Sequence, residues 1–217
     1  MRMKVGDEVM VCNENQQCYQ MKITDLQLDL VLGELMEKIA DDSELPLRVT
    51  IAQGLPKGDK FEWVLQKGTE CGAYGFIPVK MERSVVNIEA KKAGKKLERW
   101  AKIVKEAAEQ SHRSYLPTVH GVVDFKGFLD FAKQFEVCLF AYEKTDQSRL
   151  KQILMALTAG TSMLVLIGPE GGISEKEASL LCESGFVPLG LGPRILRTET
   201  APIYLLSAIS YEFENRG

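Results

Sequence analysis

Two loops near the carboxyl end of the chain hold the residue types that could do chemistry. The first, at 168–172, reads Gly-Pro-Glu-Gly-Gly and combines one carboxylate with glycine backbone that a ligand could approach closely. The second, at 192–200, contains two arginines, Arg194 and Arg197, and the carboxylate of Glu199. A guanidinium can stabilise developing negative charge, and a carboxylate can take up a proton. The alternatives are a rigid turn without ligand for the first loop and a helix N-cap with solvated charges for the second.

Signatures of several other reaction types are missing from the sequence. It contains no GxxxxGK[ST] phosphate-binding loop, no GxGxxG after an early strand and no GxSxG elbow. Its only two histidines, His112 and His120, cannot supply a zinc site when no Cys-x-x-Cys pair accompanies them. The sequence therefore predicts no bound metal, and either an enzyme that works without one or a protein that is not an enzyme.

The composition is that of a globular chain without a membrane span. Of the 217 residues, 45% are hydrophobic and 26% are charged. At ~150 residues per domain, this length allows one large domain or two small ones. The longest apolar runs, such as 163–167, are far too short to span a bilayer, and residues 1–10 lack the apolar region of a signal peptide. The five scattered cysteines predict reduced thiols in a cytoplasmic protein rather than a disulfide framework.

Residues 1–54 read as a small β domain. Strand-like runs occupy 8–12, 17–24, 26–32 and 45–52, and an Asn-rich turn lies at 13–15. Four strands do not close a barrel, and the chain has almost no lead-in before the first of them. We therefore expect a β domain that lacks its first strands.

Residues 55–217 read as an α/β domain that begins after a turn-rich segment. Strands and helices alternate along it, a pattern that predicts a mainly parallel sheet with helices packed against it. The predicted strands are 73–79, 118–123, 137–142, 163–167 and 186–191, and the predicted helices are 59–71, 94–110, 128–135, 148–158, 175–184 and 201–213. In open parallel sheets, ligands bind beyond the carboxyl ends of the strands, which is where both candidate loops begin.

The predicted helix 94–110 lies in a basic stretch of an otherwise acidic chain. The net charge is −3, yet basic side chains outnumber acidic ones between Lys91 and Arg113. Such a stripe is typical of a surface that binds a polyanion. The alternative is an ordinary solvated helix face.

Several motifs resemble one known family. The sequences GPEGGIS at 168–174 and GLGPRILRTET at 190–200, followed by an apolar helix, resemble the SPOUT class of S-adenosylmethionine-dependent RNA methyltransferases. Within that class, the match is closest to the bacterial family that methylates N3 of one uridine in 16S ribosomal RNA. Further stretches that resemble this family are 2–7, 57–60, 66–70, 82–86 and 109–113.

The resemblance implies a fold with two parts. The C-terminal part would be a SPOUT-type parallel sheet with helices on both faces and a trefoil knot. The N-terminal part would be a PUA-like β-barrel, apparently truncated here. The resemblance also implies a homodimer that binds S-adenosyl-L-methionine in the knot loops, with contacts from Leu166, Ile167, Gly168, Gly172, Leu191, Gly192, Leu196 and Thr200.

For the reaction itself, the site candidates are two arginines and two glutamates. Uridine N3 must lose its proton before it can attack a methyl group, and a cation beside the uracil oxygens would stabilise the resulting anion. Arg197 and Arg194 are the candidates for that cation. Glu199 is the first candidate for the base and Glu170 the second. Alternatively, Glu199 orients Arg197 through a salt bridge.

The RNA substrate would be the 16S ribosomal RNA of the small subunit. Its phosphates are expected to contact Lys95, Lys96, Arg99 and Lys102, together with the residues that the resemblance adds, Arg83 and Arg113. Two other functions remain open. One is a knotted methyltransferase that acts on another RNA site, and the other is an RNA-binding ribosome assembly factor without catalysis.

Overall fold

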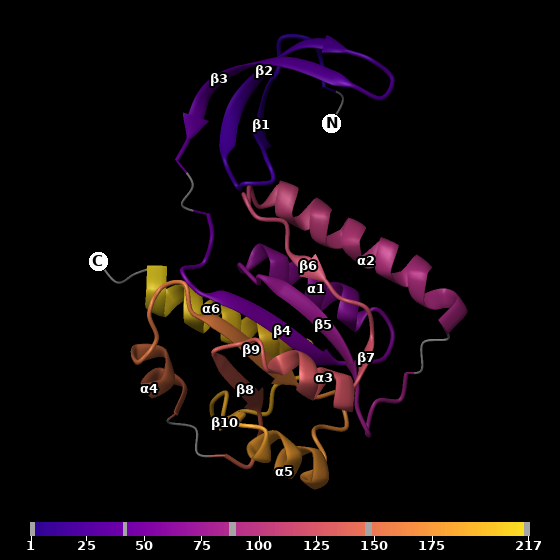
Figure 1. Ribbon diagram of the computed structural model, residues 1–217, viewed down its shortest axis with the longest axis vertical. Helices are drawn as coiled ribbons and strands as arrows, with labels where there is room; N and C mark the ends of the chain where they lie inside the picture. Colours follow the sequence, from indigo (N-terminus) through magenta and orange to yellow (C-terminus); the bar gives the residue numbers. More distant parts are fainter. Residues whose placement is uncertain (1–2, 41–42, 87–89, 146–148, 215–217) are drawn as a thin grey trace.

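The computed structural model describes residues 3–40, 43–86, 90–145 and 149–214. Within them, helices cover both faces of a seven-stranded sheet, and a separate three-stranded sheet stands beyond one end of this body (Figure 1). No helix in these ranges is long and apolar enough to cross a membrane.

The large sheet is parallel throughout. Its strands follow the order β10-β8-β9-β4-β5-β6, and β7 also pairs with β5. This confirms the predicted α/β fold with a parallel sheet. The strands are β4 (Arg48–Gly54), β5 (Gly75–Lys80), β6 (Thr118–Val119), β7 (Val123–Asp124), β8 (Val137–Ala141), β9 (Ser162–Ile167) and β10 (Val187–Leu189). The predicted strand 118–123 is thus interrupted and forms two short strands.

Helices flank the sheet on both sides. They are α1 (Lys60–Glu70), α2 (Ala90–Gln110), α3 (Phe125–Ala132), α4 (Arg149–Met155), α5 (Glu175–Glu183) and α6 (Thr200–Glu214). The alternation of side chains along a strand divides the interior into two cores. Met163, Val165 and Ile167 of β9 pack with α1, α2, α4 and α6, whereas Leu164 and Leu166 pack with α3 and α5 on the other face.

The small sheet is antiparallel and has little core of its own. Its strands β1 (Glu8–Cys12), β2 (Cys18–Leu26) and β3 (Val31–Ile39) pair in sequence order, and β3 is exposed along almost its whole length. The predicted turn between the first two strands is confirmed, because Asn13 accepts the backbone N–H groups of Asn15 and Gln17 through its side-chain oxygen, each at 3.0 Å.

The predicted strand 26–32 was wrong. Residues between Leu26 and Val31 turn the chain from β2 into β3, and the backbone N–H of Gln27 donates to the carbonyl of Leu30 at 2.8 Å. Leu28 at the tip is 99% exposed. The alternating leucines therefore mark a hairpin connection and not one face of a buried strand.

The predicted boundary after residue 54 placed one strand in the wrong part. β4 lies in the middle of the large sheet, where it pairs with both β5 and β9. Every residue of β4 except Arg48 is buried. Continuous burial is typical of a parallel strand covered on both faces, not of a β domain with one solvated face. The strands that form the separate sheet end at Ile39.

The prediction of reduced thiols was wrong for two of the five cysteines. The β1–β2 register sets Cys12 directly opposite Cys18, with a Cα–Cα distance of 4.1 Å, and the two form a disulfide bond. Cys71, Cys138 and Cys182 are free thiols. The sequence could not reveal the pair because it depends on the pairing register of the hairpin.

Candidate active site

A cavity of about 600 Å³ opens at the carboxyl ends of β10, β8 and β9, three neighbouring strands. This is the edge at which an open parallel sheet binds ligands. The walls come from three connections that leave these strands, with additions from α1 and from the loop after β5. The lining comprises 141–144, 167–173, 189–199, Lys60, Arg83, Glu175 and Ala201.

All four residues predicted to take part in catalysis line this cavity. They are Glu170 from the loop after β9, and Arg194, Arg197 and Glu199 from the loop after β10. In sequence the two loops are separated by α5 and β10, and they meet here because the carboxyl ends of the parallel strands β9, β8 and β10 lie at the same edge of the sheet. The structure thus brings the four predicted residues together, and their roles in catalysis stay predictions.

Six of the eight residues predicted to hold a cofactor also line the cavity: Ile167, Gly168, Gly172, Leu191, Gly192 and Leu196. The side chain of Leu166 is fully buried in the core on the opposite face of the sheet. Thr200 is exposed, and its N–H donates to the carbonyl of Arg197 at 2.9 Å. Neither of these two residues is among those that line the cavity, and their predicted contacts with the cofactor stay predictions.

Bare backbone forms part of the wall. A Cβ atom on Gly168 would lie 2.9 Å from Cγ1 of Ile173 and 3.1 Å from the backbone of Gly172, closer than real side chains approach. Gly172 and Gly192 have φ angles of +70° and +96°, a region that glycine adopts without steric cost. Gly168 thus lets the loop pack closely on itself, whereas Gly172 and Gly192 leave space beside their backbone for a ligand.

A lysine that the sequence analysis did not single out lies between the two loops. The Nζ atom of Lys60, in the first turn of α1, donates to Oε1 of Glu170 at 2.8 Å and lies 3.6 Å from Oε2 of Glu199. The backbone N–H of Lys57 donates to the same oxygen of Glu170 at 3.1 Å. Partial burial alone would raise the pKa of Glu170, but these hydrogen bonds and the charge of Lys60 lower it overall. The hydrogen bond with Glu170 raises the pKa of Lys60.

Glu199 is the less satisfied of the two carboxylates. Its side chain is 17% exposed, and its Oε2 atom is buried without a hydrogen-bond partner among the described residues. Within those residues, the ion pair of Glu199 is with Lys60, and none joins it to Arg197. The expected salt bridge that would orient Arg197 is therefore not formed, because α1 brings a different cation to the carboxylate.

A buried glutamine ties the two loops together. Nε2 of Gln53, in β4, donates to Oγ1 of Thr198 at 2.8 Å, and this hydroxyl donates to the carbonyl of Gly168 at 2.6 Å. Gln53 is fully buried. A glutamine at the end of an apolar strand was the available sequence signal, but its partners lie far along the chain.

Arg83 lies at the rim of the cavity. Its guanidinium donates to the carbonyl of Gly171 at 2.9 Å. The segment before it is fixed by Glu177, which accepts the backbone N–H groups of Glu82 at 2.8 Å and Ser174 at 3.0 Å. Ser174 and Glu177 also form a capping box at the start of α5. Arg83 therefore reaches the same loop that carries Glu170.

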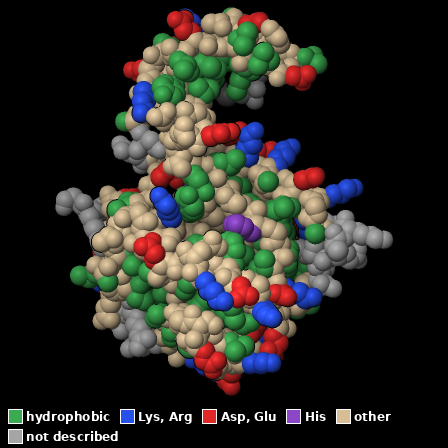
Figure 2. All heavy atoms as spheres, viewed as in Figure 1, with side chains coloured by type: hydrophobic (Ala, Val, Ile, Leu, Met, Phe, Trp, Pro, Cys, Tyr) green, Lys and Arg blue, Asp and Glu red, His purple; other side chains and the backbone are tan. Residues whose placement is uncertain are grey.

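The predicted basic stripe lies on the exposed face of α2. Lys95, Lys96, Arg99 and Lys102 are all exposed, and over α2 Figure 2 shows Lys and Arg side chains interspersed with acidic ones. Arg99 is paired with Glu62 of α1 at 2.6 Å. The side chains of Lys91 and Lys92 lie outside the described part of the structure.

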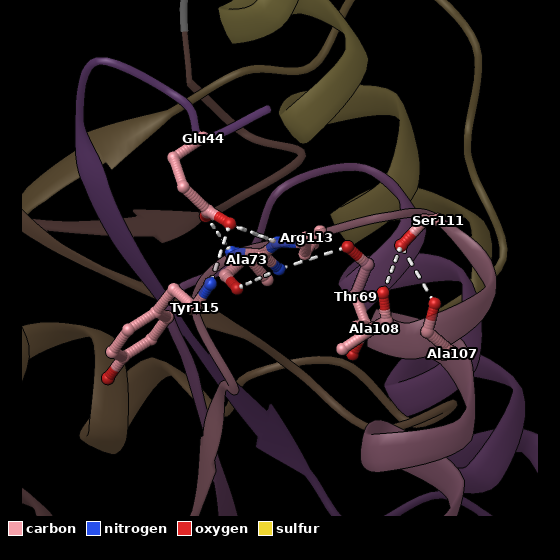
Figure 3. A network of polar contacts seen from close by, with 8 residues as sticks. All are labelled: Glu44, Thr69, Ala73, Ala107, Ala108, Ser111, Arg113 and Tyr115. Atoms are coloured by element: carbon pink, nitrogen blue, oxygen red, sulfur yellow. Dashed lines mark hydrogen bonds and ion pairs between the residues drawn. The ribbon is translucent and has the colours of Figure 1, made fainter. Parts of the chain in front are cut away.

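The prediction that Arg113 contacts RNA phosphates was wrong. Its side chain is 2% exposed and forms an ion pair with Glu44. It also donates to the carbonyls of Thr69 and Ala73, at 3.0 and 2.7 Å (Figure 3). The sequence placed Arg113 in a basic stretch, but the chain leaves α2 just before it and turns the side chain inward.

Comparisons with known proteins agree on one kind of enzyme. The RNA methyltransferase domain family matches residues 43–210, a span that includes β4. The chain is 47% identical to the Ribosomal RNA small subunit methyltransferase E of Bacillus subtilis, over 99% of this chain and 85% of that protein. A solved structure of the protein of that name from Neisseria gonorrhoeae, bound to S-adenosyl methionine, is similar with a TM-score of 0.84 and 28% identity, over 97% of this chain and 85% of that one. A methyltransferase of Legionella pneumophila, solved with the same cofactor, has a TM-score of 0.83 and 30% identity over the same shares.

Proposed function

Since the chain belongs to the family of ribosomal RNA small subunit methyltransferase E, we propose that it transfers a methyl group from S-adenosylmethionine to N3 of a uridine in 16S ribosomal RNA. The observation that carries this proposal is the cavity at the strand ends. Its walls combine bare glycine backbone with two arginines and a glutamate oxygen that has no hydrogen-bond partner in the described structure.

The cavity fits S-adenosylmethionine in size and in chemistry. Ligand sites of this kind typically enclose about 300–1,000 Å³. Backbone at Gly172 and Gly192 is open to the adenosine, and the side chains of Leu191 and Leu196 give the adenine an apolar surface. When bound, this cofactor supplies an electrophilic methyl group.

Glu199 is the base that the geometry favours. N3 of a neutral uracil carries a proton, which must leave before the nitrogen can act as a nucleophile. Glu199 lines the cavity with a side chain that is 17% exposed, and no hydrogen bond within the described residues occupies its Oε2 atom. Its carboxylate can therefore accept that proton. Glu170 is a poorer candidate, because its Oε1 already accepts from Lys60 and from the backbone of Lys57. Arg194 and Arg197 line the cavity and can stabilise the negative charge that develops on the uracil oxygens.

The RNA would approach along the exposed basic face of α2. Lys95, Lys96, Arg99 and Lys102 are placed to contact phosphates, and Arg83 at the rim would contact the nucleotide that enters the cavity. A base that is to be methylated at N3 must be unpaired, so the uridine is expected to leave its stack. Replacing one of these lysines should weaken binding for any RNA sequence.

The active protein would be a homodimer. Large apolar side chains are exposed on the loop after β10 and on α6: Ile195 at 87%, Tyr204 at 40% and Tyr211 at 73%. An exposed apolar surface of this kind is typical of a subunit interface. Sedimentation of the purified chain would measure its state of association.

Other features implied by the family resemblance belong to the same proposal. They are a trefoil knot in the C-terminal part, a PUA-like character of the β1–β3 sheet and action in the cytoplasm on the small ribosomal subunit. The two domains would divide between β3 and β4. A folding assay of residues 43–210 without the β1–β3 sheet would test that division.

The test is methyl transfer from labelled S-adenosylmethionine to small ribosomal subunits that lack the modification, followed by mass spectrometry of the nucleosides. A 3-methyluridine product is expected. Glu199→Gln should abolish most of the transfer while it leaves cofactor binding measurable by calorimetry. A different methylated nucleoside would refute the target atom, and binding without any transfer would favour an assembly factor.

A further inference from the structure

Lys60 is the one cation of α1 that reaches the site, and the proposed chemistry does not yet give it a role. α1 is fixed on the body of the protein, because Phe61, Val64 and Leu65 are buried in the core that this helix shares with α6. The position of the first turn is therefore set by packing and not by the loops of the cavity. Lys60 thus extends from a rigid element toward two flexible side chains.

The two loops and their carboxylates are held in different ways. The loops are joined by hydrogen bonds from the Gln53 side chain to the Thr198 hydroxyl and from that hydroxyl to the carbonyl of Gly168. The carboxylates project beyond these contacts into the cavity. The Lys60 ammonium lies 2.8 Å from Glu170 and 3.6 Å from Glu199. Among the described residues it is the one cation in contact with both.

The cation also balances two like charges. Without Lys60, the carboxylates of Glu170 and Glu199 would share one end of the cavity and repel each other. With it, Glu170 takes the short hydrogen bond, and the Oε2 atom of Glu199 stays close to the ammonium but without a hydrogen bond. Lys60 thereby engages Glu170 in a hydrogen bond, whereas the carboxylate of Glu199, which lines the cavity, keeps its buried Oε2 atom without one among the described residues.

We propose that Lys60 is a positioning residue. It holds the carboxylate of Glu199 in place as the proton acceptor, and its hydrogen bond to Glu170 prevents that carboxylate from accepting the proton instead. This role rests on the proposed function. Lys60 contacts neither the base nor the cofactor in it and acts through the two glutamates. The remaining charged groups that line the cavity are Arg83, Glu143, Lys144, Glu175, Arg194 and Arg197.

The experiment compares Lys60→Met with the unchanged protein in single-turnover methyl transfer at saturating cofactor. A misplaced catalytic group can cost about a hundredfold in rate, and we expect a loss of that order. The calorimetric Kd for S-adenosylmethionine should change by less than about threefold, because the loop backbones are held by other contacts. Lys60→Arg should recover most of the rate, since a guanidinium can pair with two carboxylates.

Lys67→Met is the matched control. Lys67 lies on the same helix and pairs with Glu70 at 2.7 Å, and its side chain is 37% exposed against 33% for Lys60. The Lys67→Met variant should leave both the rate of methyl transfer and the Kd for S-adenosylmethionine unchanged. In addition, Lys60→Met combined with Glu199→Gln should be no slower than the slower single variant, because both changes remove the same step.

The outcomes are distinct. If the unchanged protein transfers methyl groups and Lys60→Met does so equally fast, the positioning role is refuted and the proposed function stands. If rate and cofactor affinity fall together, or if Lys60→Arg recovers nothing, the role is also refuted, in favour of direct binding. If the unchanged protein transfers no methyl group, the proposed function fails and this role falls with it.

Discussion

Replacing Arg113 by methionine tests whether this residue belongs to the RNA-binding surface or to the fold. In the structure, its guanidinium donates to both carboxylate oxygens of Glu44 and to the carbonyls of Thr69 and Ala73. Glu44 also accepts the backbone N–H of Tyr115 at 3.1 Å. Arg113 thereby joins the segment before β4, the end of α1 and the chain that leaves α2 (Figure 3).

The expected loss of stability follows from these contacts. The buried carbonyl of Ala73 loses the donor that Arg113 supplies, whereas the carbonyl of Thr69 keeps the backbone N–H of Gly72 at 3.0 Å. An unsatisfied buried polar group costs about 1–3 kcal/mol. Breaking a fully buried ion pair costs about 3–5 kcal/mol, but the side chain of Glu44 is 23% exposed, so water recovers part of that energy. Methionine retains most of the aliphatic packing. We therefore expect Arg113→Met to lower the free energy of unfolding by about 3 kcal/mol.

Urea denaturation followed by fluorescence measures this change. With a slope of about 2–3 kcal/mol per molar urea, the midpoint should fall by about 1–1.5 M. Lys102→Met is the control, because this side chain is 75% exposed on α2 and its pair with Glu106 is 3.8 Å long; its effect should stay within about 0.5 kcal/mol. An unchanged midpoint for Arg113→Met, together with weaker RNA binding, would refute this reasoning and restore a phosphate-binding role.

Three further predictions concern the strand ends and the pH dependence. Gly54→Ala should lower the free energy of unfolding by about 1–3 kcal/mol in thermal denaturation, because a Cβ atom would lie 2.5 Å from the proline ring in the loop after β9. Gln53→Leu should raise the calorimetric Kd for S-adenosylmethionine about fivefold, the equivalent of one lost hydrogen bond to Thr198, and should leave the rate at saturating cofactor near normal. Burial lowers the pKa of His120 from its ordinary value of 6.5. The unfolded chain therefore binds more protons below that pH, so stability should fall as the pH drops from 6.5 and should fall less in His120→Gln than in His112→Gln.

The parts of the fold that the sequence predicted are those with strong local periodicity. The helix predicted over 94–110 and the strand predicted over 163–167 rest on apolar spacing alone, and the structure has them at Ala90–Gln110 and Ser162–Ile167. The capping box at Ser174 follows from two residues three positions apart. In each case, the information that determines the structure lies within one short window.

Predictions failed where a structure depends on partners that are distant in the chain. The burial of Arg113 depends on Glu44, and the disulfide between Cys12 and Cys18 depends on a hairpin register. Neither can be deduced from residue type, since arginine is mostly exposed and an odd number of cysteines suggests no pairing. In both cases, a contact formed in the folded chain determined the state of the residue, and the neighbouring sequence did not indicate it.

β4 shows that such an error can also hide functional residues. As part of a separate β domain, this strand and the turn after it would have no access to the site. As the central strand beside β9, it brings Gln53 to the Thr198 hydroxyl of one loop and the Gly168 carbonyl of the other. It then leads directly into α1, whose Lys60 contacts both carboxylates. One continuous segment therefore supplies two independent supports, one for the cofactor-binding backbone and one for the proton acceptor. The two residues lie close together in the sequence, Gln53 near the end of β4 and Lys60 at the start of α1. Because they act on different parts of the loops, changes at Gln53 should alter the affinity for the cofactor and changes at Lys60 should alter the rate of methyl transfer.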